Sequence, residues 1–169
     1  EQPGNKPVVA ANSAVDEATK ETVLYAYTFV TQYDEETAPS PISDPLEVSP
    51  GVVVNVTNFS VPALGRNIDR MRLYRTETST LASTDLYFVA EFPVSNLVYN
   101  HDLATHPIQE IIPTRDYDIP PAALKGITSM PNGMMAAYDG KTLRFCEPYR
   151  PHAWPIKYEL ITDFEIMGL

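Results

Sequence analysis

The stretch TVLYAYTFVTQY, Thr22–Tyr33, decides the fold class of this 169-residue chain. Its residues alternate between two sides with a period of two, which is the pattern of a β-strand, and most are β-branched or aromatic, the types that strands favour. Both sides are largely apolar, so the pattern indicates a central strand, buried on both faces. One side carries Val23, Tyr25, Tyr27, Phe29, Thr31 and Tyr33, and the other carries Leu24, Ala26, Thr28, Val30 and Gln32.

Further strand-like segments follow on the C-terminal side. A Pro-rich turn at residues 34–45 excludes a helix directly after the first strand, because Pro cannot continue one. Strands at this spacing, with no helix between them, are typical of a β-sandwich, and the sequence predicts one over residues 21–106. The preceding residues 1–20 are expected to form an N-terminal arm or a first strand. The later strands are expected at residues 51–59, 68–78, 85–92 and 97–100.

A second unit is predicted over residues 122–169, after a Pro-rich stretch at residues 107–121 that is either a linker or a covering segment lying against the sandwich. Within it, the pair Asp139-Gly140 between two alternating apolar runs predicts a hairpin with a type I′ turn, in which both central residues have positive φ. Tight turns and short strands predict an antiparallel sheet like one blade of a β-propeller. A single sheet of this kind cannot bury its own faces, so the unit is expected to be incomplete. Its edges, and those of the sandwich, would be covered by partners or by further sequence.

Composition limits the classes of partner. The chain carries a formal net charge of −10 and a pI near 4.6, which makes nucleic acid an unlikely specific partner, since such binders present a basic surface. The sequence has no run of 18 apolar residues, so no membrane-spanning helix is predicted. One Cys excludes an internal disulfide framework.

Residues 139–155 hold the chain's one Cys and one Trp, and they raise the question of a catalytic site. A Cys nucleophile needs a nearby base and usually a third, orienting group. Cys146 ends an apolar strand, where a free Cys usually packs as a small hydrophobe, and no catalytic Cys pattern surrounds it. The pair Cys146 and His152 therefore predicts packing, and the sequence predicts no catalytic residue, no small-molecule substrate and no enzyme.

Metal and cofactor sites are not predicted either. One Cys and one His fall short of the four ligands of structural zinc, and His101 and His106 have no third ligand at useful spacing. The acidic run Asp34–Glu36 lacks the alternating oxygen ligands and central Gly of a calcium loop, so a solvated turn is the favoured interpretation.

Two groups of residues are candidates for protein interfaces. Four arginines form a basic stripe opposite the acidic N-terminal third: they are either ordinary sandwich surface, or they meet acidic faces across subunits of a ring. A Pro-held loop presents Tyr149, Arg150 and Trp154, which suit docking onto a neighbouring sheet or subunit. The arginines of the stripe are Arg66, Arg70, Arg72 and Arg75.

Three stretches carry a resemblance to known proteins. YAYTFVTQYDEETAPSPIS (residues 25–43) resembles the late hairpin of fibronectin type III-like modules, and residues 69–103, with LYR and YFVAE, resemble their middle strands. The order of the two patterns is reversed, which leaves a rearranged sandwich or two joined part-modules as alternatives. Together with PPAALKGITSMPNGMMAAYDGKTLRFCEPYRPHAWP (residues 120–155), the pattern resembles virion structural proteins of tailed bacteriophages, in which a sandwich leads into a propeller-like region of a tail hub or nozzle. That family usually has Ser at the position of Cys146, which does not point to a nucleophile.

The resemblance implies a non-enzymatic structural component of a phage tail, made in the bacterial cytoplasm and located in the virion. Its partners would be copies of itself and neighbouring tail proteins. An alternative is a carbohydrate-binding or adhesive β-module, which would need a shallow groove lined by exposed aromatic residues. A third is an accessory fragment of a propeller hydrolase, which would need ionisable groups clustered at a propeller centre.

Overall fold

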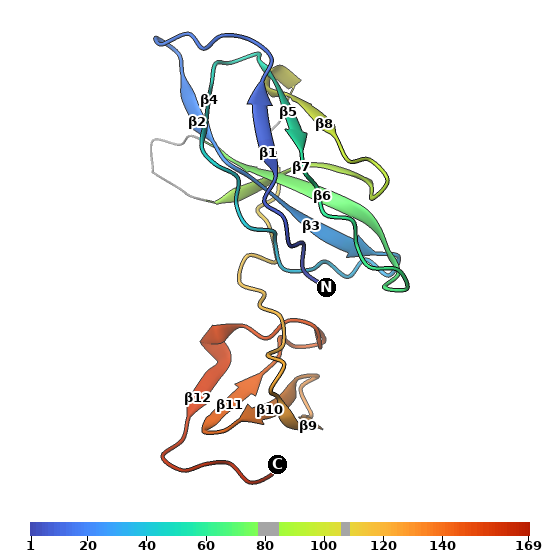
Figure 1. Ribbon diagram of the computed structural model, residues 1–169. Helices are drawn as coiled ribbons and strands as arrows, with labels where there is room; N and C mark the ends of the chain where they lie inside the picture. Colours follow the sequence, from blue (N-terminus) through green and yellow to red (C-terminus); the bar gives the residue numbers. More distant parts are fainter. Residues whose placement is uncertain (78–84, 106–108) are drawn as a thin grey trace. The chain divides into compact units, whose positions relative to one another are not determined.

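The computed structural model describes residues 1–77, 85–105 and 109–169. Within these ranges the regular elements are β-strands and two short 3-10 helices, η1 (Leu103–Thr105) and η2 (Ile156–Tyr158), so the all-β prediction is confirmed. The chain divides into two compact units, Glu1–Thr114 (unit 1) and Arg115–Leu169 (unit 2) (Figure 1).

The described residues of unit 1 form three antiparallel sheets, with the strand orders β1-β5-β8, β2-β4 and β3-β6-β7. Each sheet combines segments that lie far apart in the sequence, so the pairing is mostly long-range. Of the two alternatives for residues 1–20, the structure has a strand, since β1 pairs with β5. The strands are β1 (Val8–Ala11), β2 (Glu21–Val23), β3 (Tyr25–Thr31), β4 (Leu46–Val48), β5 (Val53–Thr57), β6 (Ile68–Thr76), β7 (Leu86–Pro93) and β8 (Tyr99–Asp102).

The main core of unit 1 lies between the sheet β3-β6-β7 and the strands of the other two sheets (Figure 1). Alternation places every second residue of β3 and β6 on this side, because cross-strand partners share a face. Tyr27 lies opposite Leu73, and Phe29 lies opposite Met71. The buried cluster comprises Val23, Tyr25, Tyr27, Phe29, Val48, Val54, Val56, Phe59, Met71, Leu73, Val89 and Phe92. Two apolar inner faces packed in this way form a β-sandwich.

β3 is not the central strand of its sheet, contrary to the prediction, because β6 lies between β3 and β7. The outer face of β3 is nevertheless buried. Ala26 packs in a second cluster with Tyr74, Leu86 and Ile112, and Thr28 is fully buried. The apolar second face of β3 therefore reflects cover by other parts of the chain and not a central position.

The free edge of β3 is covered by residues 36–43 of the same chain. This segment carries a hydroxyl at every third position, and each of these residues makes two hydrogen bonds to the backbone of β3. Its N–H donates to a β3 carbonyl, and its hydroxyl accepts the N–H of the same β3 residue. The pairs are Thr37 with Phe29, Ser40 with Tyr27, and Ser43 with Tyr25. The expected turn is thus an edge cover that satisfies the backbone of β3.

The opposite edge of the sheet, at β7, is covered from within the chain over its first residues. The N–H of Phe88 donates to the carbonyl of Glu110 at 2.9 Å, and the N–H of Ile112 donates to the carbonyl of Leu86 at 2.8 Å. Residues 109–113, named here the β7-edge segment, therefore belong to unit 1 and lie against the sandwich, as the covering alternative for this stretch predicts. The β3 edge is thus covered within the chain, and the β7 edge is covered within the chain at Leu86 and Phe88.

Unit 2 is a four-stranded antiparallel meander with the order β12-β11-β10-β9, as the blade-like prediction requires. Its strands are β9 (Lys125–Ser129), β10 (Met135–Asp139), β11 (Thr142–Phe145) and β12 (Glu159–Ile161). A small core of Ala137, Cys146 and Trp154 lies on one face of this sheet.

The hairpin at Asp139-Gly140 forms, but its turn differs from the prediction. Asp139 pairs with Thr142, which leaves Gly140 and Lys141 as the two central residues. Of these, Gly140 has a positive φ (57°) and Lys141 does not. That combination is the pattern of a type II′ turn, which needs Gly at its first central position, and not of type I′.

Candidate functional site

Polar side chains form a cluster on the outer face of the sheet β3-β6-β7, the face that points away from the main core. Strand alternation explains it, since the inward residues Met71 and Leu73 leave Arg70, Arg72 and Tyr74 pointing to the other side of β6. This outer face also receives carboxylates from the segment that covers the β3 edge and from β7.

Glu36 is the buried centre of this cluster, with 6% of its surface exposed. One carboxylate oxygen, Oε1, accepts hydrogen bonds from the Tyr74 hydroxyl at 2.6 Å and the Thr28 hydroxyl at 2.8 Å. The other oxygen, Oε2, accepts Nη1 of Arg72 at 2.8 Å. A buried carboxylate is tolerated only when it is paired and hydrogen-bonded, and Glu36 is both. The prediction of a solvated turn at Asp34–Glu36 is therefore wrong for Glu36.

Glu91 joins the two arginines of the face. Its Oε2 accepts Nε of Arg72 at 2.8 Å, and its Oε1 accepts Nη1 of Arg70 at 3.1 Å. Arg70 also contacts Asp34 at 2.8 Å and Asp69 at 3.2 Å. Two guanidinium groups thus meet four carboxylates, those of Asp34, Glu36, Asp69 and Glu91, and the cluster carries an excess of negative charge.

Contacts within the cluster shift the pKa values of three of its members, Tyr74, Glu91 and Arg72. Burial raises the pKa of the Tyr74 phenol, and the charge and hydrogen bond of Glu36 raise it further, so Tyr74 remains a hydrogen-bond donor. Partial burial acts to raise the pKa of Glu91, but the hydrogen bonds from Arg72 and Arg70 outweigh it, and the net pKa lies below its ordinary value. Burial acts to lower the pKa of Arg72, but Glu91 and Glu36 outweigh it and raise it.

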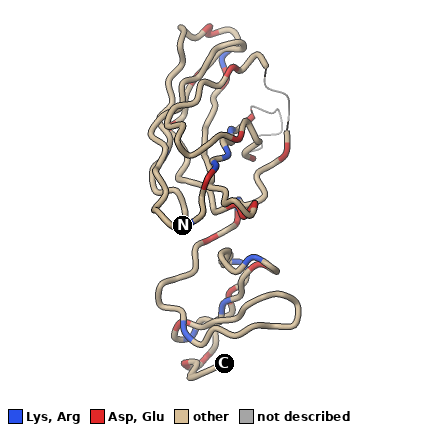
Figure 2. Tube along the Cα trace, turned by 90° about the vertical axis from the view of Figure 1, so that its right-hand side faces the viewer, with Lys and Arg blue, Asp and Glu red and all other residues tan. Residues whose placement is uncertain are grey.

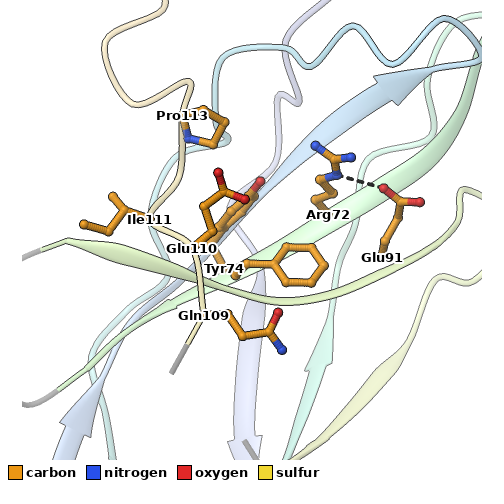
Figure 3. A pocket seen from close by; sticks show the side chains of 8 residues that line it. Arg72, Tyr74, Glu91, Gln109, Glu110, Ile111 and Pro113 are labelled. Atoms are coloured by element: carbon orange, nitrogen blue, oxygen red, sulfur yellow. Dashed lines mark hydrogen bonds and ion pairs between the residues drawn. The ribbon is translucent and has the colours of Figure 1, made fainter. Parts of the chain in front are cut away.

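A cavity of 360 Å³ opens beside this cluster, between β6, β7 and the β7-edge segment (Figure 3). Arg72 and Glu91, joined by their ion pair, form one side of it, and Gln109 and Glu110 lie on the side of the β7-edge segment. The complete lining is Arg72, Tyr74, Phe88, Glu91, Gln109, Glu110, Ile111 and Pro113.

The predicted arginine stripe does not form one surface. Arg70 and Arg72 lie on the outer face, paired with carboxylates of their own chain, and Figure 2 shows acidic and basic positions close together within unit 1. Arg75 faces the opposite side, opposite Tyr25, and is 6% exposed. Arg66 is exposed in a turn. The acidic and basic regions therefore meet within one chain, while contact across subunits stays a prediction.

The loop that carries the other interface candidates is divided between core and surface. Trp154 is 3% exposed, and its indole N–H donates to the carbonyl of Pro151 at 2.9 Å. It is therefore a core residue of unit 2 and presents almost no surface to a neighbour. Tyr149 is 78% exposed and lies over Gly133, and Arg150 is exposed as well. A carbohydrate groove built on Trp154 is excluded by its burial.

Cys146 has a packing role in the structure. It is fully buried, and its sulfur accepts the N–H of Met135 at 3.0 Å. The ring of His152 lies edge-to-face with that of Tyr117, at 6.0 Å between centroids. Among the described residues no group of three potential metal-ligating side chains is present. His101 is buried and contacts the hydroxyl of Tyr25 at 2.8 Å, and His106 lies outside the described residues.

Unit 2 has an edge that its own chain leaves open. β9 pairs with β10, and along its other edge no backbone partner is present in the ranges that the structure covers. All five residues of β9 are exposed. Large apolar side chains of the same unit are exposed too: Ile127, Met130, Tyr149, Ile156, Leu160, Ile161, Phe164, Met167 and Leu169.

Sequence reasoning missed Glu36, Glu91 and the β7-edge residues. Two signals were available. Thr37, Ser40 and Ser43 recur every third residue beside a strand, which suits an edge cover, and Glu91 interrupts the apolar pattern of its strand. Neither signal indicates which residue the side chain contacts, because the contacting residues lie far apart in the sequence.

Comparison with known proteins does not assign the chain to a family. No protein-family model matches the chain, and no curated protein is similar to it in sequence. In the part of the chain described, no helix has the length and apolar character needed to cross a bilayer. The function has to be argued from the geometry of the two units.

Proposed function

We propose that the chain is a non-enzymatic structural component of a phage tail, located in the virion and acting through contacts between subunits of a symmetric assembly. The observation that carries this proposal is the open edge of β9 in unit 2. The β3 edge of unit 1 is covered within the chain, whereas β9 exposes backbone groups that have no partner among the described residues, beside exposed apolar side chains. Such an edge accepts a strand from another chain, and exposed apolar surface favours the same contact.

The likeness of residues 120–155 to tail hub or nozzle proteins supports the same assignment, because that stretch includes β9 and the hairpin after it. Partners would be further copies of the chain or neighbouring tail proteins. Closed symmetric assembly is the common way for a repeated chain to cover identical edges.

Mass in solution tests this proposal. We expect light scattering after size exclusion to show association that grows with protein concentration, and Ile127→Lys to reduce it, since a charge on an edge strand blocks pairing. Val61→Lys is the control, because Val61 is an exposed apolar residue of unit 1 that lies outside the strands (71% exposed, against 57% for Ile127). A protein that stays monomeric at all concentrations, alone and mixed with tail proteins, would contradict the proposal.

A further inference from the structure

The cavity on the outer face of unit 1 presents hydrogen-bonding groups that have no partner among the residues that the structure describes. Nη2 of Arg72 has no hydrogen-bond partner among the described residues, although Nη1 and Nε are both paired. The side chains of Gln109 and Glu110 are exposed and make no hydrogen bond within the described ranges. The cavity therefore offers free donors, on Arg72 and Gln109, and free acceptors, on Glu110 and Gln109.

An apolar wall completes the cavity. Phe88, Ile111 and Pro113 line it, and Phe88 lies edge-to-face with Tyr74, at 5.9 Å between ring centroids. Tyr74 is itself fixed by its 2.6 Å hydrogen bond to Glu36. Phe88 is thus packed against a side chain that is already fixed, which lowers the entropy cost of placing a ligand on it.

Charge narrows the class of ligand. The lining has two carboxylates, Glu91 and Glu110, against one guanidinium, and the buried Glu36 lies behind them, so an anionic ligand is repelled. A cationic ligand is disfavoured as well, because it would lie against Nη2 of the positively charged Arg72. A neutral ligand that both donates and accepts hydrogen bonds, and that has one apolar face, matches every part of the lining.

A sugar ring has these properties, since hydroxyl groups surround its edge and C–H groups cover its faces. Planar polar side chains bind neighbouring hydroxyls in pairs, and apolar side chains pack on the C–H face. The volume of 360 Å³ lies in the range of small-ligand sites. We propose that this cavity binds one ring of a neutral saccharide, which is a function separate from subunit contact in unit 2.

Titration of the whole chain with three neutral probes, the methyl glycosides of glucose, galactose and N-acetylglucosamine, tests the proposal. We expect at least one of them to shift the NMR signals of the Gln109 side-chain amide and of the Phe88 backbone amide. Glu110→Ala and Gln109→Ala should each weaken that binding by about tenfold, the effect of losing one hydrogen bond to a charged or bidentate group. Gln32→Ala is the matched control, because Gln32 is exposed in unit 1 and does not line the cavity.

The opposite results overturn the proposal. They are the absence of shifts with all three glycosides, or shifts that Glu110→Ala and Gln109→Ala leave unchanged. Stronger shifts at the same two residues with N-acetylarginine amide than with any glycoside would assign the cavity to a cation instead. Near-UV circular dichroism of each variant, unchanged from the parent, shows that lost binding does not come from unfolding.

Discussion

At the scale of single residues, the cluster around Glu36 distinguishes buried charge from surface charge. Glu36 and Asp34 are both acidic residues of the same segment, and each contacts an arginine at 2.8 Å. The side chain of Glu36 is 6% exposed, whereas that of Asp34 is 75% exposed. The N···O distance alone does not determine how much an ion pair contributes to the free energy of unfolding, because solvent screens the exposed pair.

Replacement of these two residues should therefore have very different effects. We expect Glu36→Ala to lower the free energy of unfolding by about 3–5 kcal/mol, because it leaves Arg72 and the Tyr74 hydroxyl without their buried partner. Asp34→Ala should cost less than about 1 kcal/mol. Urea denaturation of both variants measures the difference, and equal effects would contradict the assignment of Glu36 as the buried centre.

At the scale of elements, the β3 edge shows how a Pro-rich segment can replace a strand. Prolines 39, 41 and 45 prevent a regular ladder, since Pro has no N–H to donate. The hydroxyls of Thr37, Ser40 and Ser43 accept the β3 N–H groups that a partner strand would otherwise bind. The edge is thereby closed to pairing with other chains.

Removal of one hydroxyl tests this edge cover. Ser40 is 4% exposed, and its hydroxyl accepts the N–H of Tyr27 at 3.1 Å. We expect Ser40→Ala to destabilise the protein by about 1–3 kcal/mol, because that buried N–H loses its acceptor. Ser13→Ala, at an exposed position, should have no measurable effect in the same urea titration. A neutral Ser40→Ala would mean that the edge does not depend on the hydroxyl.

At the scale of the whole molecule, the two units have cores of very different size. Among the residues with a described structure, twelve buried ones form the main cluster of unit 1, whereas three form that of unit 2. The stability of a unit increases with the apolar area that it buries, so unit 2 should be the less stable of the two.

The single Trp makes this difference measurable. Trp154 lies in the core of unit 2, while buried tyrosines such as Tyr25 and Tyr27 lie in the core of unit 1. In a guanidinium titration, we expect the fluorescence of Trp154 to change at a lower denaturant concentration than the near-UV circular dichroism of the tyrosines. Coincident transitions would show that the chain unfolds as one cooperative body.

The sequence by itself determined the local features of this protein. Period-two alternation at Thr22–Tyr33 and in the later segments predicted an all-β chain, and Asp139-Gly140 predicted the position of the hairpin in unit 2. These features depend on the backbone preferences of neighbouring residues, which a linear pattern records. The type of the turn was wrong, because a Gly next to Asp allows a shift of the central pair by one residue.

The tertiary structure decided which groups meet. Alternation sorts residues onto two faces, but it does not say what covers each face, and so β3 was mistaken for a central strand. Arg72 pairs with Glu36, and residues 109–113 pair with the start of β7 and form one wall of the cavity. Trp154 was expected at an interface and is buried in its own unit. Each of these outcomes depends on contacts between segments that are distant in the sequence. Such contacts form only in the folded state, so a local sequence pattern does not record them.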